Sequence, residues 1–127
     1  MRRIFIAAAL LLISVVSGIF FSKDIGERSK KHLNRINLID SFLSKKDYKN
    51  AKITAKKTAD EFNYIDSKIM YNYYIHKDLS DIAENLYSMH GYIERKKLNE
   101  YYYISGITKN RLQSIIEREK IDLRNIL

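Results

Sequence analysis

The sequence predicts an all-α protein, in which an N-terminal transmembrane helix is followed by an antiparallel four-helix bundle made of two helical hairpins. Three observations lead to this fold class. Residues 4–21 carry no charge, proline is absent from all 127 residues, and apolar side chains recur at helical spacing through the rest of the chain. The predicted domains are a membrane anchor, residues 1–22, and a helical bundle, residues 23–127.

The apolar run at residues 4–21 is long enough for a membrane anchor. Its 18 residues would span about 27 Å as a helix, close to the roughly 30 Å hydrocarbon layer of a bilayer. A cleaved signal peptide is the alternative, with a weak cleavage option near residues 15–18, but its apolar core is usually shorter. We therefore expect an uncleaved anchor in the cell membrane. The basic residues on the two flanks of the run give opposite indications of its orientation, and those after it would by count keep the domain in the cytoplasm. Long domains cross a membrane largely regardless of their charge, however, which favours a single-pass protein with its helical domain outside the cell.

Four helices are predicted after the anchor, over residues 24–44, 48–75, 77–96 and 98–125. The second shows the spacing best, because its apolar positions alternate steps of three and four without exception: Tyr48, Ala51, Ala55, Thr58, Phe62, Ile65 and Ile69. Asp47 is its expected N-cap. Gly106 is the weak point of the last helix, where it costs about 1 kcal/mol relative to alanine. Four such helices bury one another best as an antiparallel bundle.

The two halves of the domain align at an offset of fifty residues. The matched pairs include Ile36 with Leu86, Ile39 with Met89, and Lys46 with Lys96. Each half thus has a helix, a lysine-rich turn and a second helix. Duplication explains the match, and so does the periodicity that any two amphipathic hairpins share.

Positive charge is concentrated next to the anchor. Residues 23–57 hold eleven Lys and Arg against four acids, whereas residues 58–127 hold ten against eleven. A basic surface beside a membrane attracts anionic lipid, and the candidate lipid-facing residues are Lys23, Arg28, Lys30, Lys31 and Arg35. An ordinary solvated helix face is the alternative. No nucleic-acid-binding motif is present, so we expect no nucleic-acid partner.

Ten tyrosines without any tryptophan suggest a protein-binding surface. Three consecutive helical residues, 101–103, cannot share one face, and an exposed tyrosine buries a large area at low entropic cost when it binds. The candidate partner surface consists of Tyr71, Tyr73, Tyr74, His76, Tyr102 and Tyr103. The alternative is that these rings fill the core and cover its apolar rim.

No catalytic, cofactor or metal signature is found. The chain lacks cysteine, the three histidines lie far apart at positions 32, 76 and 90, and neither a metal-binding motif nor a glycine-rich phosphate loop is present. We therefore predict no catalytic residue, no cofactor and no metal, and we expect the protein not to be an enzyme.

Three segments resemble a known family of small bacterial proteins, the domain of unknown function four-three-six-three. They are residues 46–51 at the start of the second helix, residues 73–79, which contain the Tyr-Tyr pair and His-Lys-Asp-Leu, and the ending at residues 119–127. The resemblance implies a spore-forming Gram-positive host, a domain anchored outside the membrane, no established activity, and a multi-pass membrane protein as partner. The tryptophans and the Glu after the histidine that are common in that family are replaced here by residues such as Tyr48, Phe62 and Asp78.

The leading hypothesis for function is a non-enzymatic, membrane-anchored accessory protein that binds an integral membrane protein or an anionic lipid surface. A ligand-binding sensor is the first alternative, and it requires a cavity lined by groups such as Tyr73, His76 and His90. A hydrolase acting on the cell envelope is the second. It requires two carboxylates, or a histidine and a carboxylate, that converge in a cleft. The sequence leaves the oligomeric state open.

Overall fold

The structure is a computed structural model that describes residues 2–71, 74 and 76–120, with the side chains at positions 18, 19, 21, 22 and 76 outside that description. This part of the chain is all-α, as predicted. Its elements are α1 (Arg2–Ser44), α2 (Tyr48–Glu61), a π-helical turn η1 (Phe62–Asp66), α3 (Ser67–Met70), α4 (His76–Glu94) and α5 (Leu98–Arg118). Positions 72–73, 75 and 121–125 of the predicted helices lie outside the described residues.

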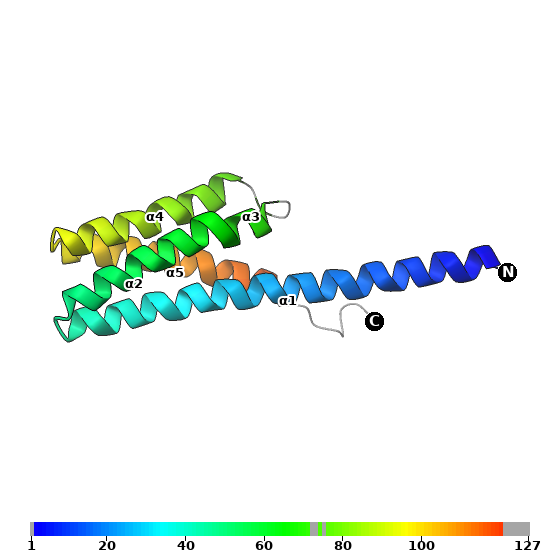
Figure 1. The fold of residues 1–127 in the computed structure, drawn as a ribbon, viewed down its shortest axis with the longest axis horizontal. Helices are drawn as coiled ribbons and strands as arrows, with labels where there is room; N and C mark the ends of the chain where they lie inside the picture. The colour runs from blue at the N-terminus through cyan, green and yellow to red at the C-terminus, as the bar shows by residue number, and fades with distance from the viewer. Residues whose placement is uncertain (1, 72–73, 75, 121–127) are drawn as a thin grey trace.

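The long helices form the predicted antiparallel four-helix bundle. Each hairpin, α1 with α2 and α4 with α5, packs against the other, because α1 also lies along α5 and α2 lies along α4 (Figure 1). Tyrosine hydroxyls tie the hairpins together: Tyr101 Oη donates to Asp40 Oδ1 at 2.6 Å, and Tyr87 Oη donates to Asp60 Oδ1 at 2.6 Å. Burial and these hydrogen bonds raise the pKa of both hydroxyls, that of Tyr87 to about 12.

Most of the core follows the helical seams that the sequence predicts. The exceptions are in η1 and in α5, where Ser105 and Thr108 are buried and Ile104 and Ile107 are only partly buried. Buried apolar side chains come from every long helix, and those on the first and last include Ile25, Ile36, Ile39, Leu43, Tyr101, Leu112 and Ile115. In α2 the buried stretch runs through Ala51, Ala55 and Ala59 to Phe62. Alanine takes up little space at these positions of α2, whereas Tyr101 and Phe62 are the largest fully buried side chains described.

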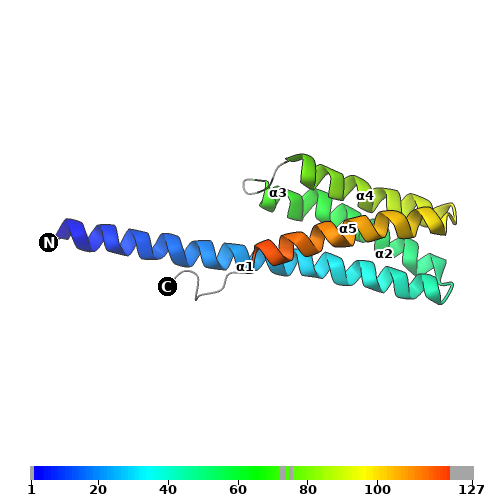
Figure 2. The same ribbon diagram turned by 180° about the vertical axis from the view of Figure 1, so that it is seen from behind.

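The two hairpin turns have the same conformation fifty residues apart. Lys46 and Lys96 adopt left-handed backbone angles, with φ of 60° and 56°. The amide of residue 46 donates to the carbonyl of residue 43 at 3.0 Å and that of residue 47 to the carbonyl of residue 42 at 2.8 Å, and the second turn repeats both bonds at the same distances. This is the Schellman motif that ends a helix. The sequence repeat therefore corresponds to a structural repeat, and both turns lie at one end of the bundle (Figure 2).

The N-terminal part of α1 extends beyond the bundle as an arm (Figures 1 and 2). No proline interrupts α1, which continues through Gly26 into the bundle, and Ile25 is the first buried side chain described along it. Ahead of Ile25 the described apolar side chains, such as Ile4 and Phe5, are exposed.

The predicted membrane anchor is not supported by the structure. Among the described residues, no helix is long and apolar enough to cross a membrane. The predicted transmembrane helix is therefore wrong, and so is the single-pass location in the cell membrane that depended on it.

Candidate functional site

The π-helical turn η1 changes which side of the chain faces the core. After Phe62, the alternation of three and four predicts Ile65 and Ile69 as the next buried positions. The structure instead buries Asp66 and Met70 completely, and it leaves Ile65 half exposed. The amide of Ser67 donates to the carbonyl of Phe62, five residues back. This wider turn contains one extra residue. The positions that face the core after Phe62 are therefore each one residue later in the sequence than predicted.

Asp66 is fully buried and lies against basic groups of α1. Its carboxylate forms a hydrogen bond with His32 Nε2 and accepts one from Arg28 Nη1 at 2.8 Å, while Lys31 Nζ lies 3.6 Å away. Burial alone would raise the pKa of this carboxyl, but the hydrogen bonds and the nearby positive charges hold its pKa below the ordinary value. The His32 ring is also fully buried, edge-on to Phe62 with a centroid separation of 5.4 Å.

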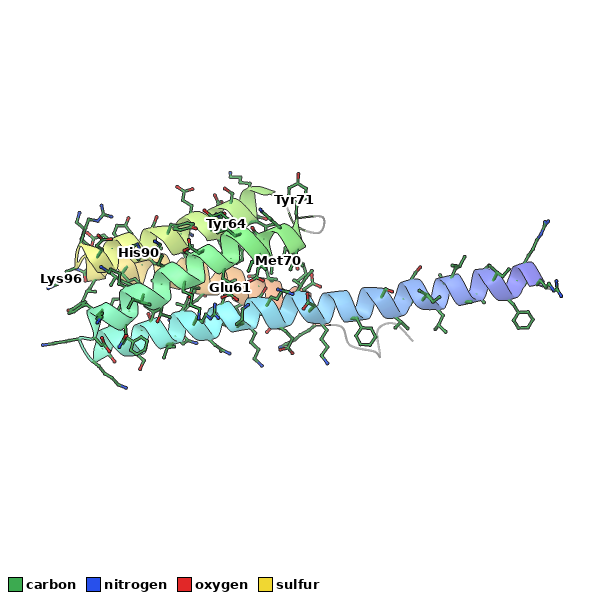
Figure 3. All side chains as sticks on the ribbon, viewed as in Figure 1. Glu61, Tyr64, Met70, Tyr71, His90 and Lys96 are labelled. Atoms are coloured by element: carbon green, nitrogen blue, oxygen red, sulfur yellow. The ribbon has the colours of Figure 1, made fainter. Side chains whose placement is uncertain are left out.

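Glu61 extends this cluster of charges toward solvent. It accepts a hydrogen bond from Arg35 and another from Lys31 at 2.6 Å. These two hydrogen bonds lower the pKa of the Glu61 carboxyl to about 2. Figure 3 shows Glu61 on the side of α2 that faces α1. Glu61 and Asp66 therefore fix α2 and η1 against α1 through charged hydrogen bonds.

These contacts occupy three of the five residues predicted to face lipid. Arg28, Lys31 and Arg35 pair with Asp66 or Glu61, and Arg28 also pairs with Asp24 at 2.8 Å. The other two, Lys23 and Lys30, are exposed. Much of the positive charge near the start of the bundle thus balances acids of the fold, which weakens the basis for a lipid-binding surface there.

The outer side of η1 carries exposed apolar residues. Ile53 is 54 % exposed, Tyr64 62 % and Ile65 50 %, and Figure 3 shows Tyr64 on the outside of the bundle. A shallow groove of about 680 Å³ follows this face, lined by Ile53, Lys56, Lys57, Asp60, Glu61, Tyr64 and Ile65. We call Ile53, Tyr64 and Ile65, with the flanking Lys56 and Lys57, the η1 face.

The predicted tyrosine surface is divided by the fold. Tyr71, Tyr102 and Tyr103 are exposed. Tyr71 follows α3, whereas the other two lie in the first turns of α5, which begins at the end of the bundle that carries the hairpin turns (Figure 2). Tyr74 is buried and donates a hydrogen bond to Glu119, so it is not part of an exposed surface. The predicted Tyr73 and the side chain of His76 lie outside the described residues. Among the members that the structure describes, Tyr71, Tyr102 and Tyr103 therefore do not form one surface.

The ligand-binding sensor requires a cavity and the hydrolase requires a cleft with converging groups, and the described residues show these features only in part. A pocket of about 210 Å³ lies between α4 and α5, below the 300–1,000 Å³ of ordinary ligand sites. It is lined by Tyr74, Asp78, Leu79, Ile82, Arg111, Ser114, Ile115 and Arg118, and His90 is not among them. His32 and Asp66 do converge, but both are buried rather than in a cleft. Within the described residues, no group of three or more His, Asp or Glu could hold a metal ion.

A comparison with protein-family models identifies the family of this chain. Residues 19–126 match the model of a domain of unknown function, DUF4363. The chain belongs to the DUF4363 family. This confirms the resemblance noted in the sequence, although the description of DUF4363 gives no activity. No curated protein and no solved structure matches the chain.

Sequence reasoning about this DUF4363 protein missed Asp66, His32 and the η1 face. Asp66 is not among the predicted site residues, and the apolar spacing assigns Ile65 to the core. One signal was available: Phe62, Asp66 and Met70 are spaced four residues apart, which also suits a helical stripe that turns slightly around the axis. A stripe through these three residues would bury an acid, which is unfavourable unless basic groups face it. The spacing along this helix does not show whether another helix supplies such groups.

Proposed function

We propose that this protein is a non-enzymatic interaction module that binds a protein partner through the η1 face. The observation that carries the proposal is the exchange made by the π turn, which buries Asp66 and exposes Ile65. Leaving an isoleucine half exposed forgoes about 1 kcal/mol of hydrophobic stabilisation, and a buried carboxylate must be matched by charged partners. An α-helical turn with Ile65 inside would avoid both costs.

A binding role would explain why the chain buries Asp66 and exposes Ile65 despite the loss of stability. Departures from the locally preferred structure occur mostly at functional sites, and single π turns inside helices are common there. Tyr64 and Ile65 follow one another on the surface, and Ile53 lies on the same side of α2 three turns earlier. Tyrosine is among the residues that dominate binding energy at protein interfaces, and an apolar patch with a polar rim is typical of an interaction site.

The rim of the η1 face suits a partner with both apolar and acidic groups. Lys56 and Lys57 are exposed and form no ion pair with any described acid. They flank Ile53, whereas Asp60 and Glu61 are already engaged with Tyr87, Lys31 and Arg35. Asp60 keeps its negative charge, because the Tyr87 hydroxyl that binds it is neutral. The two lysines outnumber this carboxylate, so the net charge of the rim is positive.

Photo-crosslinking in the native host tests this proposal. A photoreactive phenylalanine replaces Tyr64 in one variant and Tyr103, which is 71 % exposed at the other end of the bundle, in a matched control. We expect a discrete crosslinked protein from position 64 that is absent from position 103 and is lost when Ile53→Ser and Ile65→Ser are added. Identical crosslinking patterns at the two positions, or a product that survives both serine substitutions, would overturn the proposal.

A further inference from the structure

The end of the bundle formed by the two hairpin turns is strongly basic. We call it the basic tip, and it comprises Lys45, Lys46, Lys49, Arg95, Lys96 and Lys97. All six are exposed, and none forms an ion pair with a described acid. Figure 3 shows Lys96 at the extremity of the bundle, away from the arm. The repeat therefore places two lysine-rich turns side by side at this end of the bundle.

Helix electrostatics do not explain all of these cations. Lys45, Lys46, Arg95 and Lys96 follow the C-termini of α1 and α4, where positive charge is favourable. Lys49 and Lys97, in contrast, lie at helix N-termini. Lys49 lies in the first turn of α2, and Lys97 is the N-cap of α5 and makes no side-chain capping hydrogen bond. A positive charge is unfavourable at a helix N-terminus, and lysine is a poor N-cap. In the first hairpin turn, the position equivalent to Lys97 is occupied by Asp47, whose side chain caps α2.

Lys46 and Lys96 also occupy unfavourable backbone positions. Their left-handed φ values of 60° and 56° belong to the position of a Schellman motif that is usually glycine. Four of the six cations thus stand where another residue would stabilise the fold better. Two of the side chains are held over aromatic rings, with Arg95 Cζ 5.4 Å from the Tyr92 centroid and Lys96 Nζ 5.3 Å from that of Tyr48. Such contacts hold a cation at the surface without neutralising it.

We propose that the basic tip binds an anionic lipid surface. Five of the six cations are lysine, and clusters of four to eight basic residues are typical of anionic-lipid binding, whereas lysine is depleted from protein interfaces. Two adjacent turns form a blunt end, which a planar bilayer can contact at both turns simultaneously. This site lies at the other end of the bundle from Lys23 and Lys30, and it is independent of the η1 face.

Vesicle binding by the full chain tests the proposal with variants that should fold better than the wild type. The tip variant combines Lys46→Gly, Lys96→Gly and Lys97→Asn, each of which places a preferred residue at its position. The matched control, Lys30→Gln, Lys68→Gln and Lys77→Gln, removes the same charge from exposed positions elsewhere in the bundle. The arm is common to all three proteins, so it cancels in the comparison.

Affinity for phosphatidylglycerol vesicles should fall on the order of a hundredfold at low salt in the tip variant, given the usual contribution of each lysine, and by far less in the control. Added salt should reduce the difference. Equal losses in the two variants would overturn the proposal, and so would equal wild-type binding to phosphatidylglycerol and phosphatidylcholine vesicles. It would also be overturned if the tip bound an acidic peptide or an oligonucleotide but not the anionic vesicles. None of these results bears on crosslinking at position 64.

Discussion

Asp66 and His32 form a hydrogen bond in which both side chains are completely buried, across the interface between η1 and α1. The two residues are thirty-four positions apart in the chain. Their contact is the tertiary feature that accompanies the change of register in η1. It links a local irregularity of the second helix to the packing of the first helix and, through Ile65, to the exposed η1 face.

Removal of the Asp66 carboxylate should strongly destabilise the protein. In Asp66→Ala, the His32 ring and the Arg28 guanidinium lose their buried partner, and breaking such a pair costs about 3 to 5 kcal/mol. Urea denaturation followed by circular dichroism measures the free energy of unfolding. Asp24→Ala is the control, because Asp24 also pairs with Arg28 but its side chain is 47 % exposed, and it should cost less than about 1 kcal/mol. Similar losses in both variants would contradict the assigned role of Asp66.

The stability of the fold should decline in acid because of Glu61 and Asp66. A carboxyl whose pKa is lowered by folding stabilises the protein above its unfolded pKa, and that contribution is lost as the pH falls through its folded pKa. For Glu61 the window runs from about pH 4.5 to about pH 2. We expect the wild type to lose about 1 to 2 kcal/mol more over this window than Glu61→Gln, after allowance for solvent screening. Denaturation at a series of pH values gives the comparison, and Glu84→Gln, which removes an exposed carboxylate, should follow the wild type.

Replacing Lys46 by glycine should stabilise the protein. Lysine at φ 60° pays a steric penalty that glycine avoids, and the gain should be about 0.5 to 1 kcal/mol. Lys96→Gly should gain less, because it also loses the contact with the Tyr48 ring. Lys52→Gly is the opposite control: Lys52 is exposed within α2, and glycine there should lower the stability by up to about 1 kcal/mol. Thermal unfolding of the three variants would show the expected order, and a loss of stability in Lys46→Gly would count against the left-handed turn.

Gly106 should be replaceable by alanine with a gain in stability. It lies within α5, and a methyl group added there would meet no atom within 4 Å. Alanine is favoured over glycine in a helix interior by about 1 kcal/mol. Gly106→Ala should therefore raise the free energy of unfolding by about that amount, and Gly106→Val by less because its branched side chain suits a helix poorly. An unchanged or lowered midpoint for the alanine variant would show that α5 tolerates no side chain at this position.

The parts of the fold that depend on local periodicity were predictable, and those that depend on tertiary contacts were not. The seam from Ala51 to Phe62 follows from the spacing alone, and the offset of fifty residues correctly paired the two turns. The sequence could not show that Lys46 is left-handed, because lysine is not the residue that this conformation favours. Nor could spacing show that Asp66 replaces Ile65 in the core, since the basic groups that make its burial possible come from α1.

The register of η1 can be tested directly by comparing Ile65 with Phe62. In the structure Ile65 is half exposed and Phe62 is fully buried. Ile65→Ala should therefore cost less than about 1 kcal/mol, whereas Phe62→Ala should cost about 3 to 5 kcal/mol. Ile65→Lys sharpens the comparison, since an exposed position accepts a charge and a core position does not. Denaturant midpoints for the three variants decide between the registers: a large loss in Ile65→Lys would mean that Ile65 faces the core, which would also remove the basis for the η1 face.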